Sequence, residues 1–145
     1  MIELTSTPII ILAILGSVGV ALPVINILMK EKGSVISYGI VALIALFASI
    51  GYVLYQLALD HVAPAAIFSQ DVLVDDAFGS LFAIAMLIVA IFTTVGSFSY
   101  MKNKTNPSIY FSLILLSTIG MVLVAYATDL VMLFVAWELM SIPTY

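Results

Sequence analysis

Long uninterrupted runs of apolar residues recur along the chain and are separated by short polar segments. A helix needs roughly 20 such residues to cross about 30 Å of hydrocarbon, and most of the runs reach that length. The pattern predicts an all-α, polytopic transmembrane helix bundle that forms a single membrane domain over residues 1–145. The predicted spans are residues 8–29, 35–59, 78–100, 107–127 and 130–145.

The last predicted span is short. As a helix, residues 130–145 would extend over roughly 24 Å, which is less than the roughly 30 Å thickness of the hydrocarbon core. A helix that stops there would leave its last carbonyls unsatisfied in lipid. We therefore expect a longer natural polypeptide, of which this chain is an N-terminal fragment.

The lysines predict the orientation of the spans. Lys30 and Lys32 follow the first span, and Lys102 and Lys104 follow the third. Because short connections rich in lysine stay on the cytoplasmic side, the N-terminus is expected outside.

Polar residues also predict helix ends. Asp75 and Asp76 precede the third span, and Thr128 or Asp129 precedes the last, in positions where a side-chain oxygen caps a helix. Between the second and third spans, residues 67–74 are expected to form a short strand or hairpin.

Small and hydroxyl side chains within the spans have two interpretations. A stripe at four-residue spacing in the first span indicates a close helix contact and consists of Ala13, Ser17 and Ala21. Hydroxyls of the third span either line a wet path or bond back to their own helix; they belong to Thr93, Thr94, Ser97 and Ser99. Asn26 is expected at the membrane interface.

The composition excludes several classes of protein. Hydrophobic residues make up 64% of the chain and charged residues 8%, far from the balance of a soluble domain. The absence of cysteine excludes disulfides and thiolate metal sites. With only four basic residues there is no surface for nucleic acid, and no metal cluster, phosphate loop or nucleophilic triad is evident.

Glu138 is the candidate residue for proton transfer. It lies about 12 Å along the last span, close to the centre of the bilayer. A carboxylate at that depth costs roughly 2.5 to 3.5 kcal/mol on insertion scales, and such groups normally face a protein interior or a water cavity. It is therefore either protonated or paired with a cation. The lysines and His61 lie in the connections, so a partner would come from further sequence, another subunit or a hydrated channel.

Ser141 and Phe134 share a face with Glu138, three positions after it and four before it. Ser141 is a candidate proton-path partner, although a serine also commonly bonds a backbone carbonyl. Pro143 frees the carbonyl of Leu139, which then either kinks the helix or accepts from water. Glu138 itself has an alternative role as a polar residue that only fixes helix packing.

Several stretches together resemble the antiporter-like membrane subunits of respiratory complex I. The most specific is residues 129–145, which read DLVMLFVAWELMSIPTY. The start of the third span at Asp76-Ala77-Phe78 and its end at residues 96–100 fit as well. The chain is most similar to subunit N of NADH-quinone dehydrogenases and archaeal reduced-deazaflavin dehydrogenases. The resemblance covers about residues 75–145, and the first two spans match in hydropathy and topology.

This resemblance implies about fourteen helices and a multi-pass subunit in the cell (plasma) membrane of a prokaryote. It implies a translocase role that couples quinone or methanophenazine reduction to proton export, with Glu138 paired to a lysine on a later, broken helix. The partners implied are the lipid bilayer and other membrane subunits of the same complex. No cofactor or metal is expected on this chain, because the quinone or methanophenazine and the nicotinamide or deazaflavin donor act elsewhere in the complex.

Two other functions remain open at this point. A subunit of a multi-subunit sodium/proton antiporter or of a membrane-bound hydrogenase would share the glutamate helix. A structural membrane subunit would use the acid for helix packing alone.

Overall fold

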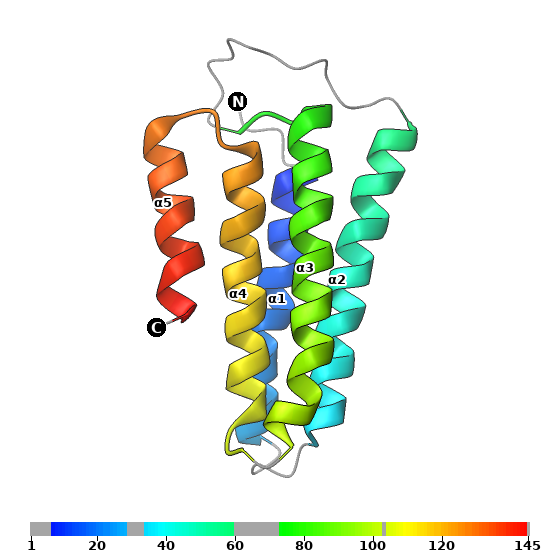
Figure 1. Cartoon of the computed structure of the whole chain (residues 1–145), viewed down its shortest axis with the longest axis vertical. Coiled ribbons are helices and arrows are strands. Elements are labelled where there is room, and N and C mark those ends of the chain that lie inside the picture. The colour runs from blue at the N-terminus through cyan, green and yellow to red at the C-terminus, as the bar shows by residue number, and fades with distance from the viewer. Residues whose placement is uncertain (1–6, 29–33, 60–72, 103, 145) are drawn as a thin grey trace.

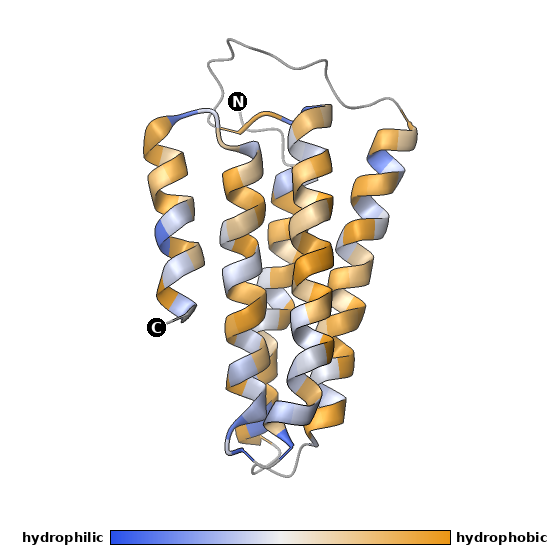
Figure 2. Ribbon diagram, in the orientation of Figure 1, coloured by the Kyte–Doolittle hydropathy of each residue, from blue (hydrophilic) through white to orange (hydrophobic). Residues whose placement is uncertain are grey.

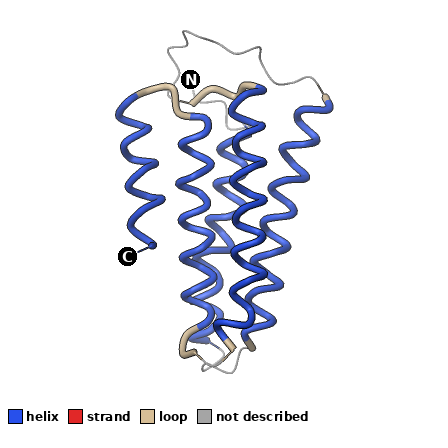
Figure 3. Tube along the Cα trace, viewed as in Figure 1, coloured by secondary structure: helices blue, strands red, loops and turns tan. Residues whose placement is uncertain are grey.

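The structure is a computed structural model that describes residues 7–28, 34–59, 73–102 and 104–144. These ranges form five α-helices and one short 3-10 helix, with no strand among them (Figure 3). The predicted all-α fold is confirmed. The elements are α1 (Thr7–Leu28), α2 (Val35–Ala58), α3 (Ala77–Met101), α4 (Pro107–Tyr126), α5 (Leu130–Ser141) and the 3-10 helix η1 (Ile142–Thr144).

Helices α1 to α4 stand side by side in alternating directions, and α5 runs next to α4 at the margin of the bundle (Figure 1). Helix α4 is central, because it packs against α1, α2, α3 and α5. Among the described elements, α5 packs only against α4 and the η1 turn that follows it. The orientation of α5 therefore depends on α4 within the described part of the chain.

The helices consist mostly of apolar residues (Figure 2), and many of their large hydrophobic side chains lie on the outside of the bundle. Large hydrophobic side chains such as Ile27, Phe92 and Leu130 are 74%, 73% and 80% exposed. An exposed apolar surface this extensive belongs in lipid rather than in water. Four helices, α1 to α4, are long and apolar enough to cross a membrane, and α5 is a shorter apolar helix. The chain is a multi-pass membrane protein.

The aspartates that precede the helices make different hydrogen bonds. Asp76 is the N-cap of α3, and its Oδ1 accepts from the Gly79 N–H at 2.7 Å, as predicted. Asp75 instead serves a different helix, because its Oδ2 accepts from the N–H of Thr7, the first residue of α1, at 2.8 Å. Asp129 occupies the N-cap position of α5, but its side chain makes no capping bond. The aspartate pair thus ties the start of α3 to the start of α1.

Among the described residues, two of the three members of the small-residue stripe in the first span do not make the predicted helix contact, and the third, Ala21, is half-buried. Ala13 and Ser17 are exposed, and the Ser17 hydroxyl donates to the Ile14 carbonyl of its own helix. The buried face of α1 is another stripe with helical spacing, which consists of Ile11, Leu15, Gly19, Leu22 and Asn26. The prediction failed because small size alone does not distinguish a packed face from a lipid-facing one.

The hydroxyls that were predicted for the third span bond mostly within their own helix. Thr93, Thr94 and Ser97 donate to the carbonyls four residues before them, which favours back-bonding over a wet path. Asn26 is buried rather than interfacial, and its Oδ1 accepts from the Tyr38 hydroxyl at 2.6 Å.

The strand predicted over residues 67–74 lies mostly outside the described residues. Of that stretch the structure describes Leu73 and Val74. Leu73 forms an isolated antiparallel bridge with Ala127, and the Val74 N–H donates to the Tyr126 carbonyl at 3.1 Å. The connection before α3 is thereby attached to the end of α4.

Candidate proton-transfer site

Glu138 is the only acidic or basic residue within the five described α-helices. It is the ninth residue of α5 and is exposed. Ala136, the one fully buried residue of α5, lies two positions earlier, and two residues correspond to about 200° around a helix. The Glu138 side chain therefore lies on the face of α5 that is turned away from α4. Phe134 lies on that face as well and is 63% exposed.

The direction of Glu138 is set by a close contact between α4 and α5. At Gly120 the two backbones approach so closely that an added Cβ would lie 2.7 Å from the Met140 Cα. The same Cβ would lie 2.9 Å from the carbonyl oxygen of Ala136. Only glycine fits here, and its absent side chain lets the two helices touch. The Gly120 contact thus selects the face of α5 that packs.

A hydrogen bond strengthens this contact near the end of α5. The Ser117 hydroxyl donates to the carbonyl of Met140 at 2.9 Å. Met140 lies in the last turn of α5, where carbonyls have no partner within the α-helix. Pro143 has no N–H to donate and cannot continue the α-helical ladder, and the chain tightens into η1. Ser117 supplies from α4 a donor that the end of α5 lacks.

Ser141, the second predicted site residue, lies in the same turn as Glu138. Its hydroxyl donates to the backbone carbonyl of Glu138 at 3.3 Å, and the Ile142 N–H donates to that carbonyl too. The structure therefore brings Ser141 to the backbone of Glu138. A role for Ser141 in a proton path stays a prediction.

Nothing among the described residues pairs with the Glu138 carboxylate. The two described lysines, Lys102 and Lys104, lie at the connection between α3 and α4, at the opposite end of the bundle from the start of α5 (Figure 1). The Lys104 ammonium lies 5.5 Å from the centre of the Tyr100 ring. No group of three or more potential metal ligands occurs in the described ranges.

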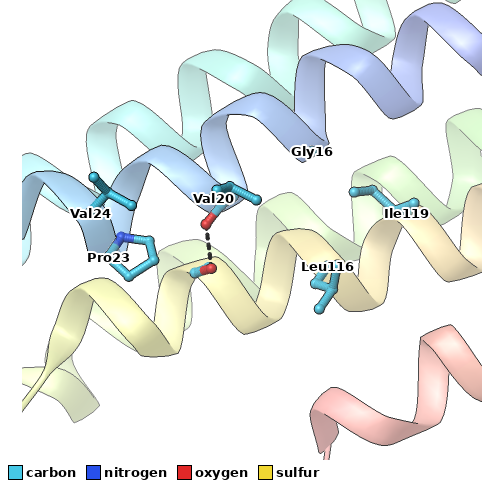
Figure 4. A pocket seen from close by; sticks show the side chains of 8 residues that line it. Gly16, Val20, Pro23, Val24, Leu116 and Ile119 are labelled. Atoms are coloured by element: carbon cyan, nitrogen blue, oxygen red, sulfur yellow. Dashed lines mark hydrogen bonds between the residues drawn. The ribbon is translucent and has the colours of Figure 1, made fainter.

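A second feature lies between α1 and α4. An apolar groove of about 250 Å³ is lined by the residues around Gly16, Gly19 and Pro23 and by the facing side of α4 (Figure 4). At its edge the Ser112 hydroxyl donates to the Gly19 carbonyl. That carbonyl precedes Pro23 by four residues, so it has no helical donor. The groove carries no ionisable group.

The sequence predicts Glu138 as a candidate site residue, but it does not point to the residues of α4 that contact the helix carrying it. Ser117 and Gly120 look like ordinary small residues of an apolar helix. Pro143 was a partial signal, because it marks the end of α5 as a place where carbonyls lack helical donors, although the carbonyl that it frees directly is that of Leu139 and not that of Met140. Which helix supplies that donor is decided by tertiary packing.

The chain is similar to NADH-quinone oxidoreductase subunit N 1 of Solibacter usitatus, with 31% identity over 140 residues, which is 95% of this chain and 27% of that protein. It is 32% identical over 133 residues to NADH-quinone oxidoreductase subunit N of Trichlorobacter lovleyi, covering 91% of this chain and 26% of that protein. This chain is a relative of those subunits. F(420)H(2) dehydrogenase subunit N of Methanosarcina mazei is 37% identical over 79 residues, or 54% of this chain and 16% of that protein.

The resemblance noted from residues 75–145 is thereby confirmed as similarity to subunit N. It also extends further than expected, because matches to 95% and 91% of the chain include the first two helices. The matched region makes up about a quarter or less of these subunit N relatives. No protein-family model and no solved structure matches the chain significantly.

Proposed function

We propose that this chain is part of a proton-translocating membrane subunit of an NADH-quinone or reduced-deazaflavin dehydrogenase complex, in which Glu138 takes up and releases the transported proton. Similarity to subunit N over most of the chain supports the type of complex. One observation carries the assignment of the site: Glu138 is the single acidic or basic residue in the five α-helices that the structure describes.

The physical argument starts from the cost of the charge. An ionised carboxylate near the centre of a bilayer is expensive, so such residues are neutral or have a partner and commonly belong to ion pathways. The described residues contain no partner for the Glu138 side chain. Its charge then depends on a cation or on water supplied by the rest of the complex, and a change in that supply changes its protonation. This dependence is what a proton-transferring group requires.

If Glu138 served helix packing alone, its side chain would need different contacts. It needs a hydrogen bond or ion pair from the Glu138 side chain to a neighbouring helix. Among the described residues that side chain forms neither, and α5 packs on α4 through its opposite face, around Ala136. The packing contacts of α5 are those of Gly120 and Ser117, so they do not use the acid.

The test is Glu138→Gln in the complete complex reconstituted into liposomes. Protons moved per electron transferred are measured with a pH-sensitive dye, beside the rate of electron transfer and the subunit composition. We expect normal assembly and a loss of proton translocation of about tenfold or more, because the amide cannot accept the proton. Asp129→Asn, at the start of the same helix, is the matched control and should translocate normally.

Unchanged translocation in an assembled Glu138→Gln complex would leave the acid with a packing role. The identity of the complex is tested separately. Quinone or methanophenazine reduction by a nicotinamide or deazaflavin donor is assigned to other subunits, so purification should recover the redox subunits of such a dehydrogenase. Recovery of hydrogenase subunits, or of no redox subunit, would favour a membrane-bound hydrogenase or a sodium/proton antiporter.

A further inference from the structure

Helix α4 carries two serines that donate to carbonyls of two different helices. Ser112 donates to Gly19 of α1, and Ser117 donates to Met140 of α5. Five residues separate the serines, which corresponds to about 140° around the helix, so they face different neighbours. Each accepting carbonyl lies within four residues before a proline, Pro23 or Pro143. Only the Ser117 bond acts on the helix that carries Glu138.

We propose that Ser117 is a positioning residue for Glu138, and this inference rests on the proton-transfer function proposed above. The contacts of α5 with α4 bracket the acid. Ala136, two residues before Glu138, faces Gly120, and Met140, two residues after it, accepts from Ser117. Both contacts lie on the side of α5 opposite to the carboxylate. They hold the backbone of Glu138 at a defined depth and rotation.

The Ser117 bond matters because the end of α5 has few donors of its own. The carbonyl of Glu138 already receives the Ile142 N–H and the Ser141 hydroxyl. The carbonyl of Met140 receives the Ser117 hydroxyl. Without Ser117 that carbonyl must find another donor, and the helix end can move or rotate to do so.

A small movement is enough to affect proton transfer. Transfer requires the reacting groups to lie within hydrogen-bond distance, and a displacement of about 1 Å can cost a factor of about 100 in rate. Rotation of α5 moves the Glu138 carboxylate further than it moves the backbone, because the carboxylate lies furthest from the contact with α4. Ser117 thereby affects proton transfer by fixing the position of the Glu138 carboxylate, without touching the proton itself.

The test compares three variants of the complete complex in liposomes. Ser117→Ala removes the hydroxyl, Ser117→Thr keeps it, and Ser112→Ala removes the equivalent hydroxyl that serves α1. We expect Ser117→Ala to lower protons moved per electron by about tenfold or more. Ser117→Thr should restore most of the translocation. Ser112→Ala should translocate normally.

The inference is overturned if assembled Ser117→Ala and Ser112→Ala complexes translocate alike. It is also overturned if Ser117→Thr is as defective as Ser117→Ala. If Ser117→Ala does not assemble, Ser117→Cys takes its place, since a thiol is a weak donor of similar size, and an intermediate loss is expected. The Glu138→Gln variant separates the two proposals. Normal proton translocation in Glu138→Gln would overturn the proposed function. Defective translocation in Glu138→Gln together with normal translocation in Ser117→Ala would overturn only the positioning role of Ser117.

Discussion

The Ser112 hydroxyl of α4 donates to the Gly19 carbonyl of α1, the carbonyl that Pro23 leaves without a helical donor. A proline in a helix interior removes the N–H that would bond the carbonyl four residues earlier. Lipid offers no donor of its own, and a hydroxyl on a neighbouring helix is one of the groups that can satisfy such a carbonyl. The relationship explains how α1 carries a proline within a predicted membrane span.

This relationship predicts that the effects of Ser112 and Pro23 on stability are coupled. Ser112→Ala should lower the free energy of unfolding by about 0.5 to 1.5 kcal/mol, the range of hydrogen bonds between membrane helices. In a Pro23→Ala background the backbone regains an N–H that can bond the Gly19 carbonyl, so the same Ser112 substitution should cost close to nothing. The measurement is denaturant unfolding of the four variants in mixed micelles, analysed as a double-mutant cycle.

Equal costs of Ser112→Ala in both backgrounds would contradict this account. They would mean that the hydroxyl stabilises the bundle through something other than the Gly19 carbonyl.

A second prediction concerns the contact of α4 with α5. Gly120→Ala should destabilise that contact by about 1 to 3 kcal/mol, the usual cost of overpacking, because the new methyl meets the backbone at Ala136 and Met140. Residues 1–145 contain no cysteine, so cysteines introduced in pairs on α4 and α5 can report the distance between these helices without competition from this region. Their cross-linking should fall in the Gly120→Ala variant.

Gly96→Ala is the matched control, because nothing lies within 4 Å of an added Cβ there. This substitution should leave α4–α5 cross-linking unchanged and gain helix propensity of up to about 1 kcal/mol. Unchanged cross-linking in Gly120→Ala would show that the two helices have room to adapt.

The helices could be predicted from the sequence almost to the residue. Residues 107–127 were predicted for α4, which runs over Pro107–Tyr126, and residues 35–59 for α2, which runs over Val35–Ala58. Apolar length and flanking polar residues are local properties, and in a bilayer they determine where a helix begins and ends. The end of α5 was less accurate, since the α-helix stops at Ser141, just before the turn that contains Pro143.

Helix faces could not be predicted in the same way. Water sorts the faces of a soluble helix by polarity, but lipid does not, so the exposed Ala13 and the buried Gly19 look equivalent in sequence. The hydrogen bond of Asp75 could not be predicted either, because it joins Asp75 to Thr7, which lies 68 positions away in the sequence. Glu138 was identifiable because a lone acid in an apolar run is conspicuous, whereas Ser117 and Gly120 acquire their roles only through packing.

A third prediction concerns the buried pair of Asn26 and Tyr38. Tyr38→Phe removes the donor to the Asn26 Oδ1 and leaves that oxygen buried, because both residues are less than a tenth exposed. We expect a loss of about 1 to 2 kcal/mol in the free energy of unfolding. Tyr55→Phe is the control, since Tyr55 is 59% exposed, and it should change stability by less than about 0.5 kcal/mol. Similar effects of the two substitutions would argue against the pair.

The two N-cap aspartates should differ in their effect on stability. Asp76 accepts from Gly79 at the start of α3, so Asp76→Ala should cost about 1 kcal/mol, the typical value for a lost cap. Asp129 stands in the same position before α5 without a capping bond, so Asp129→Ala should cost a few tenths of a kcal/mol through the helix dipole alone.

Unfolding in mixed micelles measures both substitutions, and Asp76→Asn serves as the control, because an amide oxygen also caps well. A cost for Asp129→Ala equal to that for Asp76→Ala would mean that Asp129 caps α5 through its side chain after all.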